Sequence, residues 1–228
     1  MLERPFNFSI ATLSAIPTVG HYAAPMHTVE RATPGHVASL AALLGRAFAD
    51  DPMFVWPLGA ASTREHAEGF FRAFDERLAA LGWLWTTPGD HGVAAWVPPG
   101  QDVAMMEIDR KLRPAIAAVA LDCGARYEAM WEWIASKLPD ESFWYLDHIA
   151  VEAGSRGSGL GTALIQHGLA MAERDGVPAF LETARSVNVG YYERRGFRVV
   201  ADDDVPDGGP HLWFMSRPPG RARPETGP

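Results

Sequence analysis

The most regular pattern of apolar and polar positions lies in the second half of the chain. Residues 143–151 are mostly aromatic or branched and contain no proline, which predicts a strand. Residues 152–159 are rich in glycine, and apolar or small residues then recur at helical spacing. Gly176 and Pro178 predict the end of this helix. The stretch is therefore expected to form a strand, a turn and an amphipathic helix.

The same signals predict the other elements. The elements predicted before the central strand begin with a strand at 28–32, a helix N-capped by Thr33, a loop at 50–61 and a helix N-capped by Ser62. A hairpin of strands 83–86 and 93–97 follows, and then two helical pieces over 102–138, the second starting at Pro114. After the central helix they are a strand at 179–183, a short helix from Ser186, and a hairpin of strands 197–201 and 211–215. Strands and helices that alternate in this way predict an α/β fold.

Composition is that of a globular protein. The 228 residues are 47% hydrophobic and 21% charged, which suits one packed domain with appendages. We expect a poorly ordered extension at 1–25, a single domain at 26–217 and a disordered tail at 218–228. The net charge of −8 argues against nucleic acid or an anionic membrane as a partner, and residues 1–24 hold no apolar run that could cross a bilayer.

The cysteine and histidine content argues against a disulfide-bonded protein and against a metalloprotein. The single cysteine, Cys123, cannot form an internal disulfide, and this favours a cytoplasmic location. The eight histidines lack metal-ligand spacing, so we expect no metal.

The glycine-rich turn has the features of a phosphate-binding loop. Three glycines alternate along residues 157–161, where they let a ligand approach the backbone. The first N–H groups of the following helix have no partner within it, and Arg156 adds a charged donor. A dinucleotide fingerprint does not fit, because Thr162 and Leu164 stand where it needs glycine, and no P-loop motif is present.

Two motifs resemble those of one superfamily. The turn Arg156-Gly-Ser-Gly-Leu-Gly161 is similar to the pyrophosphate loop of the GNAT acyl-CoA N-acetyltransferases, and the run from Asn188 through Tyr192-Glu to Gly196-Phe197 is similar to their second signature. The segment Phe180-Leu-Glu-Thr183 also resembles the puromycin N-acetyltransferase group. The resemblance implies a mixed, mostly antiparallel central sheet flanked by helices, with splayed central strands.

The resemblance also implies acetyl-CoA as co-substrate and a set of residues that bind it. These are Ile149, Ala150, Val151, Arg156, Gly157, Ser158, Gly159, Leu160, Gly161, Thr162, Asn188 and Tyr192. The backbone N–H groups of Ile149 and Val151 would polarise the thioester carbonyl. Tyr192 would act as general acid toward the leaving thiolate, since a phenol with a pKa of about 10 is protonated at neutral pH.

The residue that takes the proton of the acceptor amine is open between two carboxylates. Strand alternation places Tyr145, Asp147 and Ile149 on one face, with Trp144, Leu146 and His148 on the other. The family pattern puts the base on the first face, which makes Asp147 a candidate. Glu182 is the other, because a carboxylate in an apolar strand is costly to bury. Asp147 could instead be a surface carboxylate, and Glu182 could be a structural hydrogen-bond anchor. An acceptor amine with a low pKa would need no strong base.

The combined expectation is a cytoplasmic N-acetyltransferase, monomeric or homodimeric, that acts on a small amine. The acceptor would be a primary amine on an aromatic or aminoacyl, antibiotic-like body. Its pocket would come from residues 50–56 with Trp131 and Trp133, and the acidic pair Asp50 and Asp51 would favour a cation. The alternatives are a peptide or protein N-terminal acetyltransferase and a non-catalytic acyl-CoA-binding regulatory domain.

Overall fold

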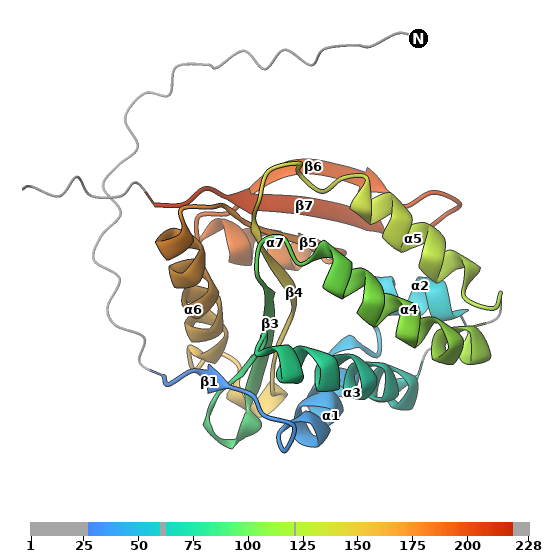
Figure 1. Ribbon diagram of the computed structural model, residues 1–228, viewed down its shortest axis with the longest axis horizontal. Coiled ribbons are helices and arrows are strands. Elements are labelled where there is room, and N and C mark those ends of the chain that lie inside the picture. Colours follow the sequence, from blue (N-terminus) through green and yellow to red (C-terminus); the bar gives the residue numbers. More distant parts are fainter. Residues whose placement is uncertain (1–26, 60–62, 121, 221–228) are drawn as a thin grey trace, which may run out of the picture.

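A seven-stranded mixed sheet forms the centre of the computed structural model, which describes residues 27–59, 63–120 and 122–220 (Figure 1). The strand order is β1-β2-β3-β4-β5-β7-β6, and only β4 and β5 pair in parallel. The strands are β1 Glu30–Arg31, β2 Leu84–Thr86, β3 Gly92–Val97, β4 Trp144–Val151, β5 Ala179–Thr183, β6 Arg198–Asp204 and β7 His211–Arg217. The helices are α1 Val37–Phe48, α2 Pro52–Leu58, α3 Arg64–Leu81, α4 Asp102–Val119, α5 Ala125–Ala135, α6 Leu160–Asp175 and α7 Ser186–Glu193. This is the mostly antiparallel sheet flanked by helices that the motifs led us to expect.

The two central strands separate soon after they meet. β4 and β5 pair only at Trp144 with Ala179 and at Tyr145 with Phe180. The rest of β4 continues along β3, while β5 pairs along its full length with β7. The sheet therefore opens into two halves with a gap between the later parts of β4 and β5, which confirms the splay.

A β-bulge in β4 changes which side chains share a face. Leu146 lies opposite Trp96 and His148 lies opposite Ala95, so Asp147 is an extra residue in the strand. Beyond the bulge, Ile149 packs with the same core as Leu146, whereas His148 contacts the rings of Phe71 and Phe74 on the opposite face. The face assignment made from strict alternation is therefore wrong after Asp147.

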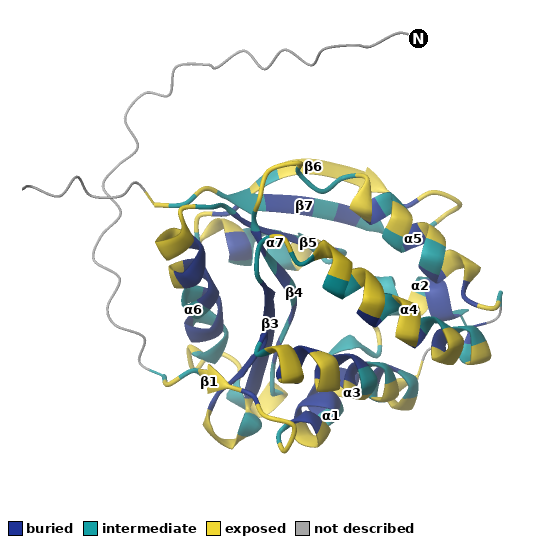
Figure 2. Ribbon diagram, in the orientation of Figure 1, coloured by how far each residue is buried: buried dark blue, intermediate teal, exposed yellow. Residues whose placement is uncertain are grey.

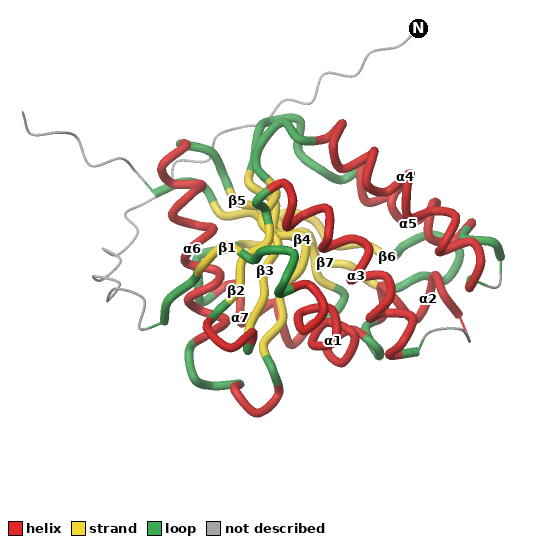
Figure 3. Tube along the Cα trace, turned by 60° about the horizontal axis from the view of Figure 1, so that its bottom comes forward, coloured by secondary structure: helices red, strands yellow, loops and turns green. Residues whose placement is uncertain are grey.

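Helices cover the two faces of the sheet unequally. α6 packs alone against one face of β3 and β4, and α1 and α3 pack against the other (Figures 1 and 3). The strands β3 and β4 are buried between them, while much of α4 is exposed (Figure 2). Trp96 is fully buried at the α6 face, where its indole N–H donates to the carbonyl of Leu164 at 3.2 Å.

The helical pair α4 and α5 spans the two halves of the splayed sheet. Ile108 and Leu112 of α4 belong to the core beneath α1 and α3, whereas Met130 and Ile134 of α5 pack with β5 and β7. An ion pair from Arg113 to Glu128 at 3.2 Å links the two helices. The pair therefore covers the gap on the side of α3.

Several expected boundaries need correction. Residues 52–58 are helical instead of a loop, because Asp51 caps α2 by accepting the Met53 N–H at 3.0 Å and Pro52 suits the first turn. α1 starts at Val37, since residues 33–36 form a turn in which His36 Nδ1 accepts the Thr33 N–H.

Two further helix signals were misplaced. Pro114 lies inside α4, which runs to Val119, and α5 starts at Ala125 directly after Gly124, which has a left-handed conformation with φ 87°. Thr63 is the cap of α3 and accepts the His66 N–H, and Ser62 lies outside the described residues. The expected extension at 1–25 and most of the tail at 218–228 also lie outside them.

Gly168 offers a test of the α6 packing. A Cβ atom there would lie 1.9 Å from the buried Trp96 ring, whereas one at Gly69 of α3 would meet nothing within 4 Å. We expect Gly168→Ala to lower the free energy of unfolding by about 2 kcal/mol or more through overpacking. Gly69→Ala should leave it unchanged or raise it by up to about 1 kcal/mol. Urea denaturation measures both, and equal stabilities would contradict the packing.

Candidate active site

A single continuous cleft enters the molecule where β4 and β5 separate. It has a volume of about 1830 Å³, larger than the roughly 300–1,000 Å³ of a typical ligand pocket. Every residue expected to act in catalysis or to bind the co-substrate lines it except Ser158. The side chain of Ser158 instead closes the turn by donating to the carbonyl of Ser155 at 2.6 Å.

The glycine-rich turn forms one end of the cleft. Gly157 and Gly159 have φ values of 82° and 99°, a region that favours glycine. Gly159 leads directly into α6, so the free N–H groups of the first turn of that helix face the cleft end. Gly161 has a different reason to be small, because a Cβ there would lie 2.7 Å from the hydroxyl of Tyr191. The local geometry suits a pyrophosphate.

The open edge of β4 supplies further backbone donors. The N–H of Glu152 donates to the carbonyl of His91 on the β3 side at 2.8 Å. Because N–H groups alternate between the edges of a strand, those of Val151 and Ile149 point to the other edge. That edge has no described pairing strand beyond Tyr145. These two N–H groups are therefore directed into the cleft, which agrees with the position expected for the thioester.

α7 contributes Asn188 and Tyr192 from the opposite wall. The Asn188 amide donates to the Thr183 hydroxyl at 3.1 Å, which fixes the start of α7 to the end of β5. Tyr192 is buried between the rings of Tyr191 and Phe197. Burial raises the pKa of Tyr192 above its ordinary value, so the phenol stays protonated and can donate a proton.

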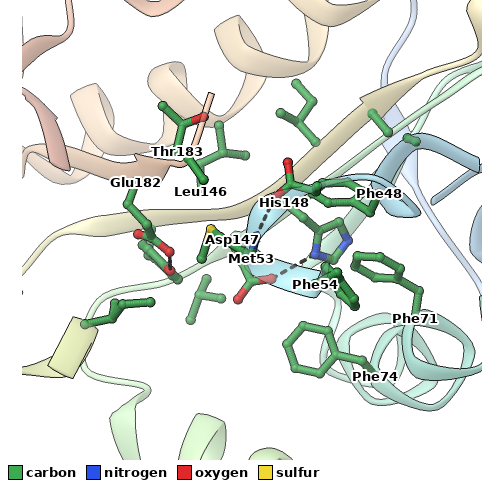
Figure 4. Close-up of a pocket in the computed structure, with 18 of the residues that line it drawn as sticks. Phe48, Met53, Phe54, Phe71, Phe74, Leu146, Asp147, His148, Glu182 and Thr183 are labelled. Atoms are coloured by element: carbon green, nitrogen blue, oxygen red, sulfur yellow. Dashed lines mark hydrogen bonds and ion pairs between the residues drawn. The ribbon is translucent and has the colours of Figure 1, made fainter. Parts of the chain in front are cut away.

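Glu182 projects from β5 into the deep part of the cleft (Figure 4). Its Oε1 accepts the hydroxyl of Tyr145 at 2.5 Å, and its buried Oε2 has no partner among the described residues. Burial raises the pKa of Glu182 to about 8, with a further contribution from Asp147. The carboxyl is therefore largely neutral at pH 7 before any ligand binds.

Asp147 lies beside Glu182 in the same part of the cleft (Figure 4). Its side chain points to the α3 face like that of Tyr145, and the bulge turns His148 to the same face, where His148 Nδ1 lies 2.8 Å from Asp147 Oδ1. Strict alternation places His148 on the face opposite Asp147, so the sequence did not predict His148 as a site residue. This prediction failed because no sequence signal marks the bulge.

Aromatic side chains from four helices surround these carboxyls. They are Phe48 of α1, Phe54 of α2, Phe70 and Phe74 of α3, and Tyr127 and Trp131 of α5. Ring centroids of Phe54 and Phe70 are 5.2 Å apart, and those of Tyr127 and Trp131 are 6.1 Å apart. Phe54 lies within the segment 50–56 expected to form the pocket, whereas Phe48, Phe70, Phe74 and Tyr127 were missed because their helical spacing is equally typical of a core.

Two residues expected in this pocket lie elsewhere. Trp133 packs against Phe214 and beneath Lys137, and Trp56 lies beneath Arg126. Neither lines the cleft.

The acidic pair at the end of α1 is paired with one cation. Arg185 donates to Asp50 Oδ1 at 2.7 Å and to Asp51 Oδ2 at 3.1 Å. One guanidinium offsets only one of the two carboxylate charges, so the attraction of a cationic acceptor by this pair stays a prediction. The contact also ties the end of β5 to the junction of α1 and α2, across the opening between the two halves of the sheet.

Comparisons with known proteins agree with the fold and the motifs. The model of the acetyltransferase (GNAT) family matches residues 115–197, from the end of α4 through α7. The solved structure of histone acetyltransferase HPA2 and related acetyltransferase from Corynebacterium glutamicum is 23% identical, with a TM-score of 0.61 over 86% of this chain and 98% of that chain. Arylalkylamine N-acetyltransferase 2 from Aedes aegypti is 13% identical, with a TM-score of 0.59 over 86% and 100%.

Residues 115–197 thus match the acetyltransferase (GNAT) family, and the fold is shared with these solved acetyltransferases. No described helix is long and apolar enough to cross a membrane. Among the residues that the structure describes, no group of three or more His, Cys, Asp or Glu side chains is arranged to hold a metal ion.

Gly159 tests the pyrophosphate turn. Valine at a φ of 99° is strained and would redirect the N–H groups at the start of α6. We expect Gly159→Val to weaken CoA binding at least about tenfold, or 1.4 kcal/mol, by calorimetry. Gly154→Ala is the matched control, because a Cβ there meets open space. Equal dissociation constants for the two folded variants would overturn the assignment.

Proposed function

We propose that the protein transfers the acetyl group of acetyl-CoA directly to the primary amine of a small acceptor with a flat apolar body. The observation that carries this proposal is the single cleft, which runs from the pyrophosphate turn past the open edge of β4 to buried carboxyls among aromatic rings. A co-substrate and an acceptor can therefore meet without a covalent enzyme intermediate.

Each part of the cleft corresponds to one demand of the reaction. The N–H groups of Ile149 and Val151 would stabilise the charge that develops on the thioester oxygen. The Tyr192 hydroxyl would give its proton to the departing thiolate. A carboxylate is needed because an alkylammonium with a pKa of about 10.4 is only about one part in 10³ neutral at pH 7. We propose Asp147 or Glu182, which both line this cleft, as the acceptor of that proton.

The enclosure of the acceptor end favours a small molecule over a peptide. α2, α3 and α5 place aromatic side chains around the carboxyls, and α4 and α5 cover the gap in the sheet. A peptide N-terminus would need an open groove at this position. The presence of both Tyr192 and a buried carboxyl argues against a non-catalytic role. Turnover assays that compare aromatic amines, aminoacyl amines and peptides, read by CoA release, test this choice.

The Tyr192 hydroxyl has a direct test. If it protonates the thiolate, Tyr192→Phe should lower kcat by about 10²- to 10⁴-fold. The affinity for acetyl-CoA should stay unchanged, since the lost interaction belongs to the transition state. Tyr191→Phe is the control, because it removes a neighbouring phenol over the pyrophosphate turn. Small, equal effects of the two variants would assign Tyr192 to packing alone.

The pH dependence distinguishes the two carboxyls. If Glu182 is the base, kcat/KM should rise with pH through about 8, where this carboxyl ionises, and Glu182→Gln should abolish that inflection. If Asp147 is the base, Asp147→Asn should lose activity near neutral pH and recover part of it by pH 10, where more amine is neutral. The kcat/KM of both variants, measured from pH 6 to 10 with one good acceptor, distinguishes the two candidate bases. Full activity of both variants at neutral pH would exclude both as bases.

A further inference from the structure

Behind Asp147 lie two buried ionisable side chains, His148 and Asp75, that the proposed acetyl transfer does not use directly. His148 Nδ1 lies 2.8 Å from Asp147 Oδ1, and His148 Nε2 lies 3.4 Å from Oδ1 of Asp75 on α3. The exposed fractions of the three side chains fall inward, from 10% at Asp147 to 2% at His148 and 0% at Asp75. The three side chains thus form a line from the cleft into the core.

Asp75 is a fully buried carboxyl on α3. Neither of its carboxyl oxygens has a hydrogen-bond partner among the described residues, and His148 is its nearest charge partner. A buried carboxyl without partners is costly, and an apolar residue of similar size would be stable there. The free-energy cost of burying the Asp75 carboxyl is explained if this carboxyl acts on the imidazole of His148.

The protonation of Asp75 and that of His148 depend on each other, because the two side chains are close and buried. Burial raises the pKa of Asp75 to about 7, and His148 opposes this rise. Burial alone would lower the pKa of His148, but Asp75 and Asp147 together outweigh it and raise that pKa. The rings of Phe71 and Phe74, with centroids 5.1 and 6.1 Å from the imidazole, exclude water and tolerate a cation.

Other ionisable groups act on the line through Asp147. Glu182 of β5 and Tyr145 of β4 lie on its cleft side, and Tyr127 of α5 also interacts with it. Tyr127 is in turn bonded to Asp109 of α4, which pairs with Arg113. Among the described groups, only Asp75 and Asp147 act directly on His148.

We propose that Asp75 and His148 are positioning residues for Asp147, with Asp75 holding the imidazole positively charged and His148 holding one Asp147 oxygen as a hydrogen-bond acceptor. The other oxygen of Asp147 is then directed to the acceptor, a role that rests on the proposed function. In that step an N–H bond of the ammonium breaks, an O–H bond forms on Asp147, and the freed lone pair attacks the thioester carbonyl.

Asp75→Asn tests the inference against Glu76→Gln, which removes the same charge from an exposed neighbour on α3. Loss of the Asp75 charge should leave the imidazole neutral and shift the acidic limb of kcat/KM upward by about one pH unit, a tenfold loss near neutral pH. Activity should return to within about twofold of the parent at pH 9–10. Glu76→Gln should keep the parental profile. A uniform loss at every pH would assign Asp75 a structural role and overturn the proposal.

The protonation state of His148 can be measured without any acceptor. In ¹⁵N-histidine-labelled native protein, the imidazole in contact with Phe71 should carry protons on both nitrogens at pH 7. A neutral imidazole would overturn the inference even if Asp75→Asn does not fold. If the native enzyme acetylates no amine in the panel, the proposed function fails and so does the role of Asp147. A neutral imidazole in an active enzyme would leave the proposed function intact and remove only the roles of Asp75 and His148.

Discussion

The structure depends on the early separation of β4 from β5. Backbone N–H groups in a protein interior need partners, and a sheet normally supplies them from the next strand. Here β5 leaves after two residue pairs and takes β7 as its partner, so the later N–H groups of β4 are left for a ligand. The strand gives up ladder hydrogen bonds and gains donors that are fixed before the reaction starts. Donors of this kind stabilise developing charge without reorganisation.

A split sheet must be held together by other contacts, and these contacts shape the acceptor pocket. α4 packs with the first half and α5 with the second, while Arg185 ties the end of β5 to Asp50 and Asp51. Asp50 and Asp51 therefore help to hold the two halves of the sheet together at the opening of the cleft. Many of the side chains that surround the two carboxyls are aromatic, so much of this part of the cleft is lined by apolar surface.

The sequence predicted those parts of the site that depend on local order along the chain. The turn around Gly157 and Gly159, the cap at Gly176 and the strand at 179–183 follow from residue types that favour one local conformation. What it could not predict depends on contacts between distant segments. The bulge at Asp147 is set by the register of β3 against β4, and it alone brings His148 to the face of Asp75. Phe70, Phe71 and Phe74 have the spacing of core residues, and only the gap in the sheet makes part of that core a pocket wall.

The two carboxyls at the base of the cleft have different environments, and the difference suits the reaction. Like charges at close range cannot both persist in a buried site. Glu182 accepts a hydrogen bond from the Tyr145 phenol, and burial raises its pKa to about 8. Asp147 has the imidazole of His148 within hydrogen-bonding distance. At neutral pH the cleft therefore holds the largely neutral carboxyl of Glu182 beside a carboxyl that is hydrogen-bonded to an imidazole. A neutral carboxyl can both donate and accept a hydrogen bond, so Glu182 is able to orient a polar group of a ligand bound beside Asp147.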